Sequence, residues 1–283
     1  MANSPAAVWR LGRGMRLACD ASRIAGIVNV TPDSFYDGGR HADAAAAVAH
    51  GLSLADDGAD MLDVGGESTR PGAAPVSLEE ELRRVVPVVA GLVAARPSVP
   101  VAVDTYKAGC AAAALDAGAV AVNDVSACAF DPGLRDVVAQ YRPGYVLMHS
   151  LGRPDTMQDD PRYGDVVEDI LAFFEERMAM LVRAGLPEEH IVLDPGIGFG
   201  KRTEHNLDIL RRLDRFASLG RPLYLGISNK SVFGAVLALP VEKRNLATAV
   251  LSALCAARGA RIHRVHDVAG VTAALRLAAV VAA

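Results

Sequence analysis

IVNVTPDSFYDGG, residues 27–39, ends a short apolar run at Asn29 and continues as a polar, glycine-rich loop. An apolar strand that delivers an amide side chain into a loop is how a barrel of alternating strands and helices presents a ligand-binding group. The same step recurs along the chain, and the residues delivered are suited to holding a flat heterocycle or a phosphate. This repetition indicates a fold whose strand ends share one binding site.

Apolar runs of strand length alternate with longer segments rich in Ala, Leu, Glu and Arg. The predicted strands cover residues 24–30, 61–64, 99–103, 120–123, 145–148, 191–193, 223–225 and 261–265. The predicted helices cover residues 43–57, 78–94, 107–117, 131–140, 166–184, 204–212, 242–257 and 271–281. Such alternation predicts parallel βαβ units, and roughly eight units in about 250 residues are the size of a closed (β/α)8 barrel, or TIM barrel.

We therefore predict an α/β protein with a single domain over residues 1–283. Residues 1–22 precede the first unit, and residues 9–11 and 15–17 flank Gly12-Arg13-Gly14. This arrangement predicts a short N-terminal hairpin beneath the barrel. An open, doubly wound parallel sheet is the alternative architecture.

Composition narrows the class of partner. The formal net charge is -4, the pI is near 6.0, and lysines and arginines form no basic block, which argues against a nucleic-acid partner. No apolar run reaches the ~18 residues of a membrane span. The N-terminus has no apolar secretory segment, and the four cysteines show no C-x-x-C spacing. We expect a cytoplasmic protein that acts on small molecules.

Polar side chains stand at or just after nearly every predicted strand end. They are Asn29, Asp63, Asp104, Asn123, His149, Asp194, Ser228, Lys230, Arg264 and His266. A buried polar group without a partner costs on the order of 1–3 kcal/mol. Because the strand ends of a barrel face one mouth, a ring of such groups indicates that a ligand supplies their partners.

Two chemical subsets can be separated. Asp104, Asn123, Asp194 and Lys230 suit an amino-oxo heterocycle such as a pterin or a purine, because a carboxylate accepts two parallel hydrogen bonds from an N–H/NH2 edge. The second subset suits phosphate oxygens and consists of Asn29, Thr69, Arg70, Arg264 and His266. Asn29 also has the oxygen ligand that a hard cation such as Mg²⁺ prefers.

Other familiar motifs are absent. DPGIGFGK, residues 194–201, fits neither G-x-x-x-x-G-K-[ST] nor G-x-G-x-x-G, so P-loop and Rossmann sites are rejected. Its glycines are interpreted as letting the backbone approach a ligand. There is no H-E-x-x-H, no G-x-S-x-G and no Cys/His cluster, so zinc hydrolysis and triad chemistry have no support.

The motifs, taken together, resemble the dihydropteroate synthases, the folate-pathway members of the pterin-binding β/α barrels. The markers are NVTPDSF (29–35), LDVGGESTRPG (62–72), VDT (103–105), ND (123–124), MH (148–149), TMQ (156–158), DPGIGFGK (194–201), SNKS (228–231) and RVHDV (264–268). They run in order from residue 24 towards the C-terminus, and the match of nine markers in sequence is far more specific than any one alone.

The resemblance implies a transferase. It implies that 6-hydroxymethyl-7,8-dihydropterin diphosphate is condensed with p-aminobenzoate to give 7,8-dihydropteroate and diphosphate, with Mg²⁺ as cofactor. It also implies a homodimer and inhibition by sulfonamides, which imitate p-aminobenzoate.

The resemblance also implies residue roles. The residues implied for the pterin are Asp104, Asn123, Asp194, Lys230 and Arg264; for the diphosphate, Asn29, Thr69, Arg70, Arg264 and His266; for p-aminobenzoate, Thr69, Pro71, Phe199, Lys230 and Ser231. Catalysis is implied for Asp63, Arg70, Asp104, Lys230 and Arg264, and Asn29 is the implied metal ligand.

One departure bears on the alternatives. The family commonly has Arg where this chain has Asn229, beside Lys230. A synthase-like paralogue without activity is therefore one alternative. The other is a methyltransferase that uses methyltetrahydrofolate and a corrinoid protein, which would explain Asp104, Asn123 and Asp194 and leave the phosphate-binding subset without a role.

Overall fold

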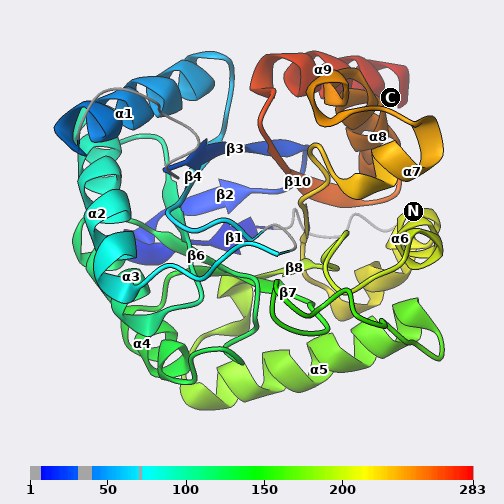
Figure 1. Cartoon of the computed structure of the whole chain (residues 1–283), viewed down its shortest axis with the longest axis horizontal. Coiled ribbons are helices and arrows are strands. Elements are labelled where there is room, and N and C mark those ends of the chain that lie inside the picture. The colour runs from blue at the N-terminus through cyan, green and yellow to red at the C-terminus, as the bar shows by residue number, and fades with distance from the viewer. Residues whose placement is uncertain (1–7, 31–39, 70–71, 283) are drawn as a thin grey trace.

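Parallel strands closed into a barrel, with helices packed around it, form the body of the molecule (Figure 1). The computed structural model describes residues 8–30, 40–69 and 72–282. The barrel strands, in chain order, are β3 (Arg23–Asn29), β4 (Met61–Gly65), β5 (Val101–Asp104), β6 (Ala121–Asp124), β7 (Gly144–Met148), β8 (Ile191–Asp194), β9 (Leu223–Leu225) and β10 (Ala260–Val265). Pairing of β10 with both β3 and β9 closes the ring. The predicted (β/α)8 barrel is confirmed, and the open doubly wound sheet is wrong.

Each predicted helix is present with its ends shifted by at most three residues, and one short helix after β9 is additional. The helices are α1 (Arg40–Asp56), α2 (Leu78–Ala95), α3 (Ala108–Asp116), α4 (Gly133–Tyr141), α5 (Val166–Ala184), α6 (Thr203–Arg211), α7 (Ser231–Leu237), α8 (Asn245–Ala256) and α9 (Val268–Ala282). Helix α7 was not predicted, because its seven residues are too few for a clear helical period. The helix predicted over 242–257 is wrong at its start, where a 3-10 turn, Val241–Lys243, follows Pro240.

The predicted hairpin lies beneath the barrel. Strands β1 (Val8–Arg10) and β2 (Arg16–Ala18) pair antiparallel. Trp9 is fully buried and donates from Nε1 to the His190 carbonyl at 2.7 Å. Gly12 N donates to the Val120 carbonyl at 2.8 Å. The hairpin therefore closes the end of the barrel where the strands begin.

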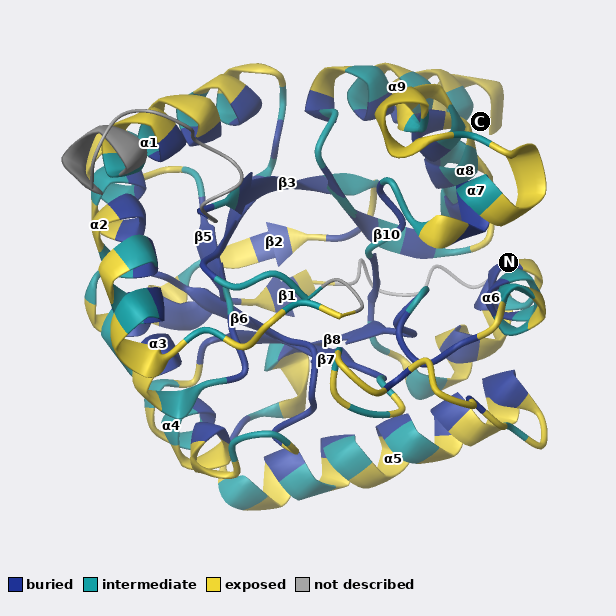
Figure 2. Cartoon of the chain, viewed as in Figure 1, coloured by how far each residue is buried: buried dark blue, intermediate teal, exposed yellow. Residues whose placement is uncertain are grey.

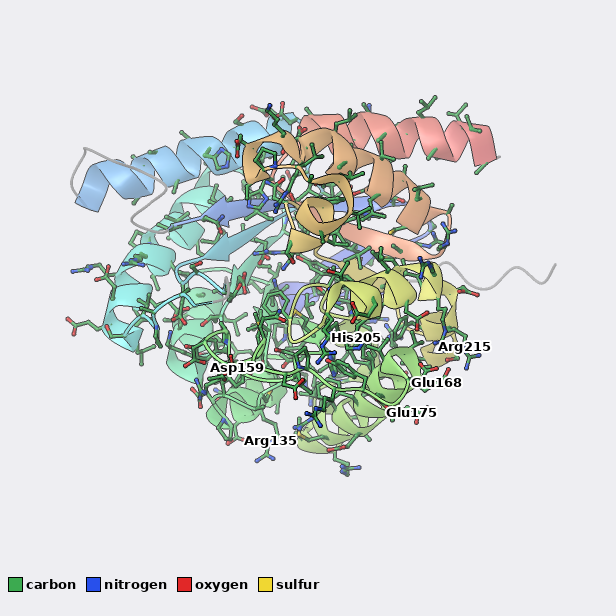
Figure 3. The ribbon with its side chains drawn as sticks, turned by 45° about the vertical axis from the view of Figure 1, so that its right-hand side comes forward. Arg135, Asp159, Glu168, Glu175, His205 and Arg215 are labelled. Atoms are coloured by element: carbon green, nitrogen blue, oxygen red, sulfur yellow. The ribbon has the colours of Figure 1, made fainter. Side chains whose placement is uncertain are left out.

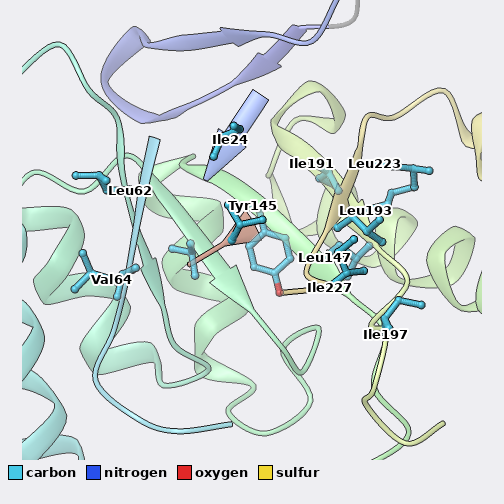
Figure 4. Packing of buried hydrophobic residues seen from close by; sticks show 14 of the residues in the cluster. Ile24, Leu62, Val64, Tyr145, Leu147, Ile191, Leu193, Ile197, Leu223 and Ile227 are labelled. Atoms are coloured by element: carbon cyan, nitrogen blue, oxygen red, sulfur yellow. The ribbon is translucent and has the colours of Figure 1, made fainter. Parts of the chain in front are cut away.

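Every barrel strand is buried on both faces. Figure 2 shows buried strands at the centre and exposed residues on the outer faces of the helices, and such strands are continuous apolar runs. Figure 4 shows part of the layer between strands and helices, where Leu62, Tyr145 and Leu147 pack. Outside it, the charges of α5 are solvated: Glu168 pairs with Arg215 at 2.9 Å, and Glu175 is exposed (Figure 3).

The barrel interior changes from apolar to polar along each strand. The lower interior cluster, against the hairpin, takes one residue from each strand: Ala25, Met61, Ala102, Ala121, Val146, Val192, Tyr224 and Ile262. Two positions further along the chain lie Ile27, Asp63, Asp104, Asn123, Met148, Asp194, Gly226 and Arg264, all within their strands except Gly226, which follows β9. Because side chains alternate between the faces of a strand, both sets face inward, and the second set forms the floor of the barrel mouth.

No helix within the described ranges combines the length and the apolar character needed to cross a membrane.

Candidate active site

The two predicted subsets meet in one cavity at the carboxyl ends of the strands. The cavity measures about 420 Å³. The predicted residues that line it are Asn29, Thr69, Asp104, Asn123, Asp194, Phe199, Ser228, Lys230, Ser231, Arg264 and His266. Asp194 and Lys230 thus share a cavity with Arg264 and His266, as a site for a ring with an anionic tail requires. Arg70 and Pro71 lie outside the described residues.

A buried charge cluster forms the floor. The Arg264 guanidinium donates from Nε to Asp63 Oδ2 and from Nη2 to Asp104 Oδ2, the latter at 2.6 Å. Asn123 Nδ2 donates to the same Asp63 oxygen at 2.9 Å. Two carboxylates sharing one guanidinium leave acceptor capacity, and Asp63 Oδ1 has no hydrogen-bond partner among the described residues. Arg264 is thus held rigidly across the floor, with Asp104 beside it at the cavity surface.

Burial sets the protonation behaviour of this floor. Removal from water raises the pKa of Asp104 to about 7, the neighbouring carboxylates of Asp63 and Glu81 add to this rise, and the Arg264 charge opposes it. The pKa of Asp194 is also raised, chiefly by burial. Asp194 Oδ1 accepts a hydrogen bond from Gly196 N at 2.8 Å, which fixes the carboxylate plane. Hydrogen-bond donors on a ligand would therefore stabilise the ionised forms of both carboxylates.

Lys230 extends over an aromatic face. Its Nζ lies 4.1 Å from the centroid of the Phe199 ring, the geometry of a cation–π contact. Ser231, the next residue, begins α7 and lines the same cavity. An ammonium group, an aromatic ring and a hydroxyl therefore converge at this edge of the site.

The backbone explains why asparagine is tolerated beside Lys230. Asn229 has φ 58°, in the left-handed region that favours Gly and Asn over other residues. Its carbonyl accepts from Arg244 Nη1 at 3.0 Å, and the Lys230 carbonyl accepts from the same atom at 3.2 Å. Arg244 Nε also donates to the Leu239 carbonyl at 3.0 Å. The strand-end loop is therefore anchored by an arginine from a different segment, one that also lines the cavity.

The glycines of the 194–201 loop serve the protein's own packing. A Cβ on Gly196 would lie 2.0 Å from the His149 carbonyl oxygen, and one on Gly200 would lie 2.5 Å from Leu151 Cβ. These contacts give Gly196 and Gly200 a steric reason within the loop. Gly196 and Gly198 also line the cavity, which agrees with the interpretation that the glycines let the backbone approach a ligand. Buried Lys201 ties the loop to the end of β7 by donating to His149 Nδ1 at 2.9 Å, and it donates within the loop to the Phe199 carbonyl at 3.0 Å. His149 is therefore a structural partner behind the cavity.

Opposite charges support the loop that follows β4. Lys107 Nζ lies between the Glu67 and Glu81 carboxylates, both buried. Tyr106 OH donates to Glu67 Oε1 at 2.8 Å, and Val76 N donates to Glu67 Oε2 at 3.1 Å. These contacts hold the backbone that carries Thr69 into the cavity.

The predicted phosphate-binding subset lies at the ends of the neighbouring strands β10, β3 and β4. Asn29 ends β3, and His266 follows β10, its neighbour in the barrel. His266 Nδ1 and Ser228 Oγ are 2.9 Å apart, and His266 N donates to the same oxygen at 3.2 Å. This pair orients the imidazole beside Arg264. With Thr69, these groups can meet an anion that bears several oxygens.

The lining residues that had not been predicted include Glu67, Met148, Met157 and Arg244. Glu67 lies within the LDVGGESTRPG marker, and the resemblance implies no role for it. Met157 lies within the TMQ marker, and it is buried beside Phe199 at the cavity edge. Nothing in the local sequence around Arg244 distinguishes it from a solvated helix arginine.

Comparison with known proteins settles the family. The model of the family described as pterin binding enzyme matches residues 25–266. Dihydropteroate synthase of Escherichia coli (strain K12) is 41% identical over 265 residues, which are 94% of this chain and 93% of the relative. The chain belongs to the dihydropteroate synthase family.

Two further members add detail. The structure of Xanthomonas albilineans dihydropteroate synthase with 4-aminobenzoic acid superposes with a TM-score of 0.91 at 45% identity, over 98% of this chain and 99% of that one. A probable bifunctional folylpolyglutamate synthase/dihydropteroate synthase of Haloferax volcanii is 44% identical over 92% of this chain. The chain spans only 30% of that archaeal protein, so it matches one part of it.

Proposed function

We propose that this dihydropteroate synthase family member condenses 6-hydroxymethyl-7,8-dihydropterin diphosphate with p-aminobenzoate, giving 7,8-dihydropteroate and diphosphate. The observation that carries the proposal is the convergence of Asp194 and Lys230 with Arg264 and His266 in one cavity. The near full-length synthase relative from Escherichia coli supports the same activity. No observation favours the corrinoid methyltransferase, because it gives Arg264 and His266 no anion to bind.

The ring is assigned to the carboxylate side. Asp194 and Asn123 offer acceptors and donors to the amino-oxo edge of a pterin, and Asp104 lies beside them on the floor. Lys230 donates to a ring carbonyl or nitrogen while its stem covers Phe199. Arg264, fixed by Asp63 and Asp104, packs against the ring face.

The diphosphate is assigned to Asn29, Thr69 and His266, with Arg264 and Arg70. Neutralising the leaving group lowers the barrier to breaking the C–O bond. The C–O bond breaks, its electron pair leaves with the diphosphate oxygen, and the methylene carbon becomes a cation conjugated with the dihydropterin ring. The Asp104 carboxylate stabilises that charge. The aniline nitrogen of p-aminobenzoate then forms the new C–N bond and releases one proton to diphosphate or solvent.

The chemistry of the donors fits Mg²⁺ as the cofactor. Within the described residues, no group of three His, Cys, Asp or Glu side chains forms a protein cage for a metal. Mg²⁺ often takes only one or two protein ligands and binds substrate phosphates with the rest of its shell. The Asn29 amide oxygen at the anion side of the cavity supplies one such ligand. When bound there, the ion adds positive charge to the leaving diphosphate.

Phe199, Lys230 and Ser231, with Thr69 and Pro71, are assigned to p-aminobenzoate. The described members of this set line the cavity beside the pterin side, so the aniline can approach the methylene carbon from that edge. Sulfonamides that imitate p-aminobenzoate are expected to compete for the same edge.

A homodimer is also part of the proposal, in a cytoplasmic setting. Large apolar side chains are exposed on α8 and α9, which pack side by side (Figure 1). They are Leu246, Val250 and Leu254 on α8 and Leu277, Val280 and Val281 on α9. On α8 they recur every four residues, so they form one stripe. Exposed apolar patches of this kind mark protein interfaces.

The test is a reaction that requires both substrates. With Mg²⁺, purified protein should release diphosphate and form dihydropteroate only when the pterin diphosphate and p-aminobenzoate are both present. Lys230→Ala and Arg264→Ala should each lower kcat/KM by about 100-fold or more, because each removes a charge aimed at the reacting groups. Arg215→Ala, on the exposed outer face, is the matched control. Wild-type rates in both site variants would remove the proposed site.

A further inference from the structure

A second cavity lies at the opposite end of the barrel. It measures about 420 Å³ and is bounded by the hairpin turn, the end of α4 and the segment before β8. Its lining includes Arg10, Arg13, Arg16, Arg142 and His190. None of these residues lines the candidate active site, so this basic cavity is separate from it.

The basic cavity concentrates positive charge on a protein that is acidic overall. The chain carries a formal net charge of -4, yet four guanidinium groups border this one hollow. Within the described part of the chain, one of these arginines pairs with a carboxylate: Arg10 Nε lies 3.8 Å from Glu189 Oε1. Both side chains of that pair are at least half exposed. Arg13, Arg16 and Arg142 have no carboxylate within 4.0 Å there. Their charges remain available to an anion.

Two of the arginines have a backbone conformation that glycine adopts with less strain. Arg13 has φ 55° and Arg142 has φ 47°, both in the left-handed region. Arg142 caps the C-terminus of α4, a position that usually takes Gly. Non-glycine residues in this conformation cost free energy and gather at functional sites. Two such outliers on one cavity indicate that their side chains, rather than their backbones, are what the site requires.

One guanidinium is also oriented in advance. Arg13 Nη2 donates to the Leu115 carbonyl at 2.8 Å and to the Asp116 carbonyl at 3.3 Å, at the end of α3. These bonds use one nitrogen of the fork and leave the others as donors. The hairpin turn that carries Arg13 is fixed in turn by the Gly12–Val120 hydrogen bond. A site with ordered donors loses less entropy when it binds.

We propose that the basic cavity binds an oligophosphate, an anion of two or more linked phosphoryl groups. Guanidinium groups bind phosphate oxygens in pairs, and here they come from β1, the turn, β2 and the end of α4. The volume lies in the range of small-molecule sites and exceeds what one phosphate fills. The proposed synthase reaction does not use this cavity.

The test uses sodium tripolyphosphate in titration calorimetry on the His266→Ala protein, in which the other anion site is weakened. One bound tripolyphosphate per chain is expected, with affinity that falls steeply as salt rises. Arg16→Ala should weaken binding about 10-fold or more. Arg142→Gly should do the same while the protein melts at an equal or higher temperature, since glycine fits φ 47° without strain. Dihydropteroate formation in Arg142→Gly, with His266 intact, should match the wild type.

Arg135→Ala is the matched control, because Arg135 lies on the same helix α4, is exposed (Figure 3) and does not line the cavity. Equal affinity in Arg142→Gly and Arg135→Ala would overturn the proposal, as would the absence of binding in His266→Ala. Equal affinity for tripolyphosphate and ATP supports a free oligophosphate as the ligand of the basic cavity. Much tighter binding of ATP supports the oligophosphate chain of a nucleotide as the ligand. Binding of an RNA oligonucleotide alone would also refute the oligophosphate site.

Discussion

Arg264 supplies the positive charge that balances the carboxylates on the floor of the site. Asp63 and Asp104 approach it from two other strands, and Asn123 bonds to Asp63. Removing Arg264 would leave two buried carboxylates without their cation, which costs several kcal/mol in comparable cases. Activity and stability are therefore coupled at this position. Asp104 is the better probe of the chemistry, because its pKa lies in an accessible range.

We predict that kcat rises with pH through about 7 as Asp104 ionises. Burial raises the pKa of Asp104 to about 7, so below this pH the carboxyl is neutral and cannot stabilise a cation. Asp104→Asn should lower kcat by about 100-fold or more and remove this step from the pH profile. The measurement is kcat at saturating substrates from pH 5.5 to 9. An unchanged acid limb in Asp104→Asn would assign the step to another group.

The same pKa shift has a consequence for stability with the opposite sign. Asp104 binds its proton more tightly in the folded state than in the unfolded chain, where its pKa is 3.8. Its contribution to stability is thus fully present below pH 3.8 and is lost as pH rises through about 7. The catalytic form of the site is therefore the less stable form, an ordinary trade-off for a buried charge.

At the scale of the elements, Arg244 holds the loop between β9 and α7 from its place at the start of α8. Arg244, immediately before α8, donates to carbonyls of Asn229 and Lys230 ahead of α7 and of Leu239 after it. A Cβ on Gly234, within α7, would lie 2.6 Å from Arg244 Nη2. The absence of a side chain at that position lets the guanidinium reach the loop.

We predict that Arg244→Ala raises the KM for p-aminobenzoate about 10-fold or more and changes the KM for the pterin diphosphate much less. Each lost bond to a charged donor weakens the loop by about 1.5–3 kcal/mol, and this loop carries Lys230 and Ser231. Gly234→Ala should produce the same selective effect by displacing the guanidinium. Steady-state kinetics for both substrates provide the measurement. Arg258→Ala, an exposed arginine just beyond α8, should behave as wild type, and equal changes in both KM values would contradict the positioning role.

At the scale of the whole molecule, the exposed apolar side chains of α8 and α9 predict how the protein assembles. Val250 and Leu277 are 53% and 66% exposed on these helices. Burial of such side chains contributes about 25 cal/mol per Å² removed from water, and a buried carboxylate at an interface opposes association strongly. The double variant Val250→Asp, Leu277→Asp should be a monomer where the parent protein is a dimer. Light scattering after gel filtration measures the mass, and Val182→Asp is the control, because the Val182 side chain is 42% exposed on a different helix, α5. A parent protein of monomer mass would end the homodimer proposal.

Much of the fold and most of the site could be predicted without coordinates, because both follow from periodicity. Alternating strands and helices require a parallel sheet, and the period of two along each strand places Asp63, Asp104, Asn123, Asp194 and Arg264 on the inner face. Helix α7 and the anchoring role of Arg244 escaped prediction for a shared reason. A seven-residue helix has little period, and a contact between segments 14 or 15 residues apart leaves no local pattern.

The sequence by itself determined the barrel, the hairpin and the residues that reach the barrel mouth, since these depend on local patterns repeated along the chain. Only the tertiary structure decided which carboxylates share Arg264, why Asn229 fits beside Lys230, and what the glycines at 196 and 200 avoid. It also gathered Arg10, Arg13, Arg16 and Arg142, which are scattered in the sequence, around one cavity. Pairing, steric contact and local charge density depend on distance in space, and closing the barrel sets those distances.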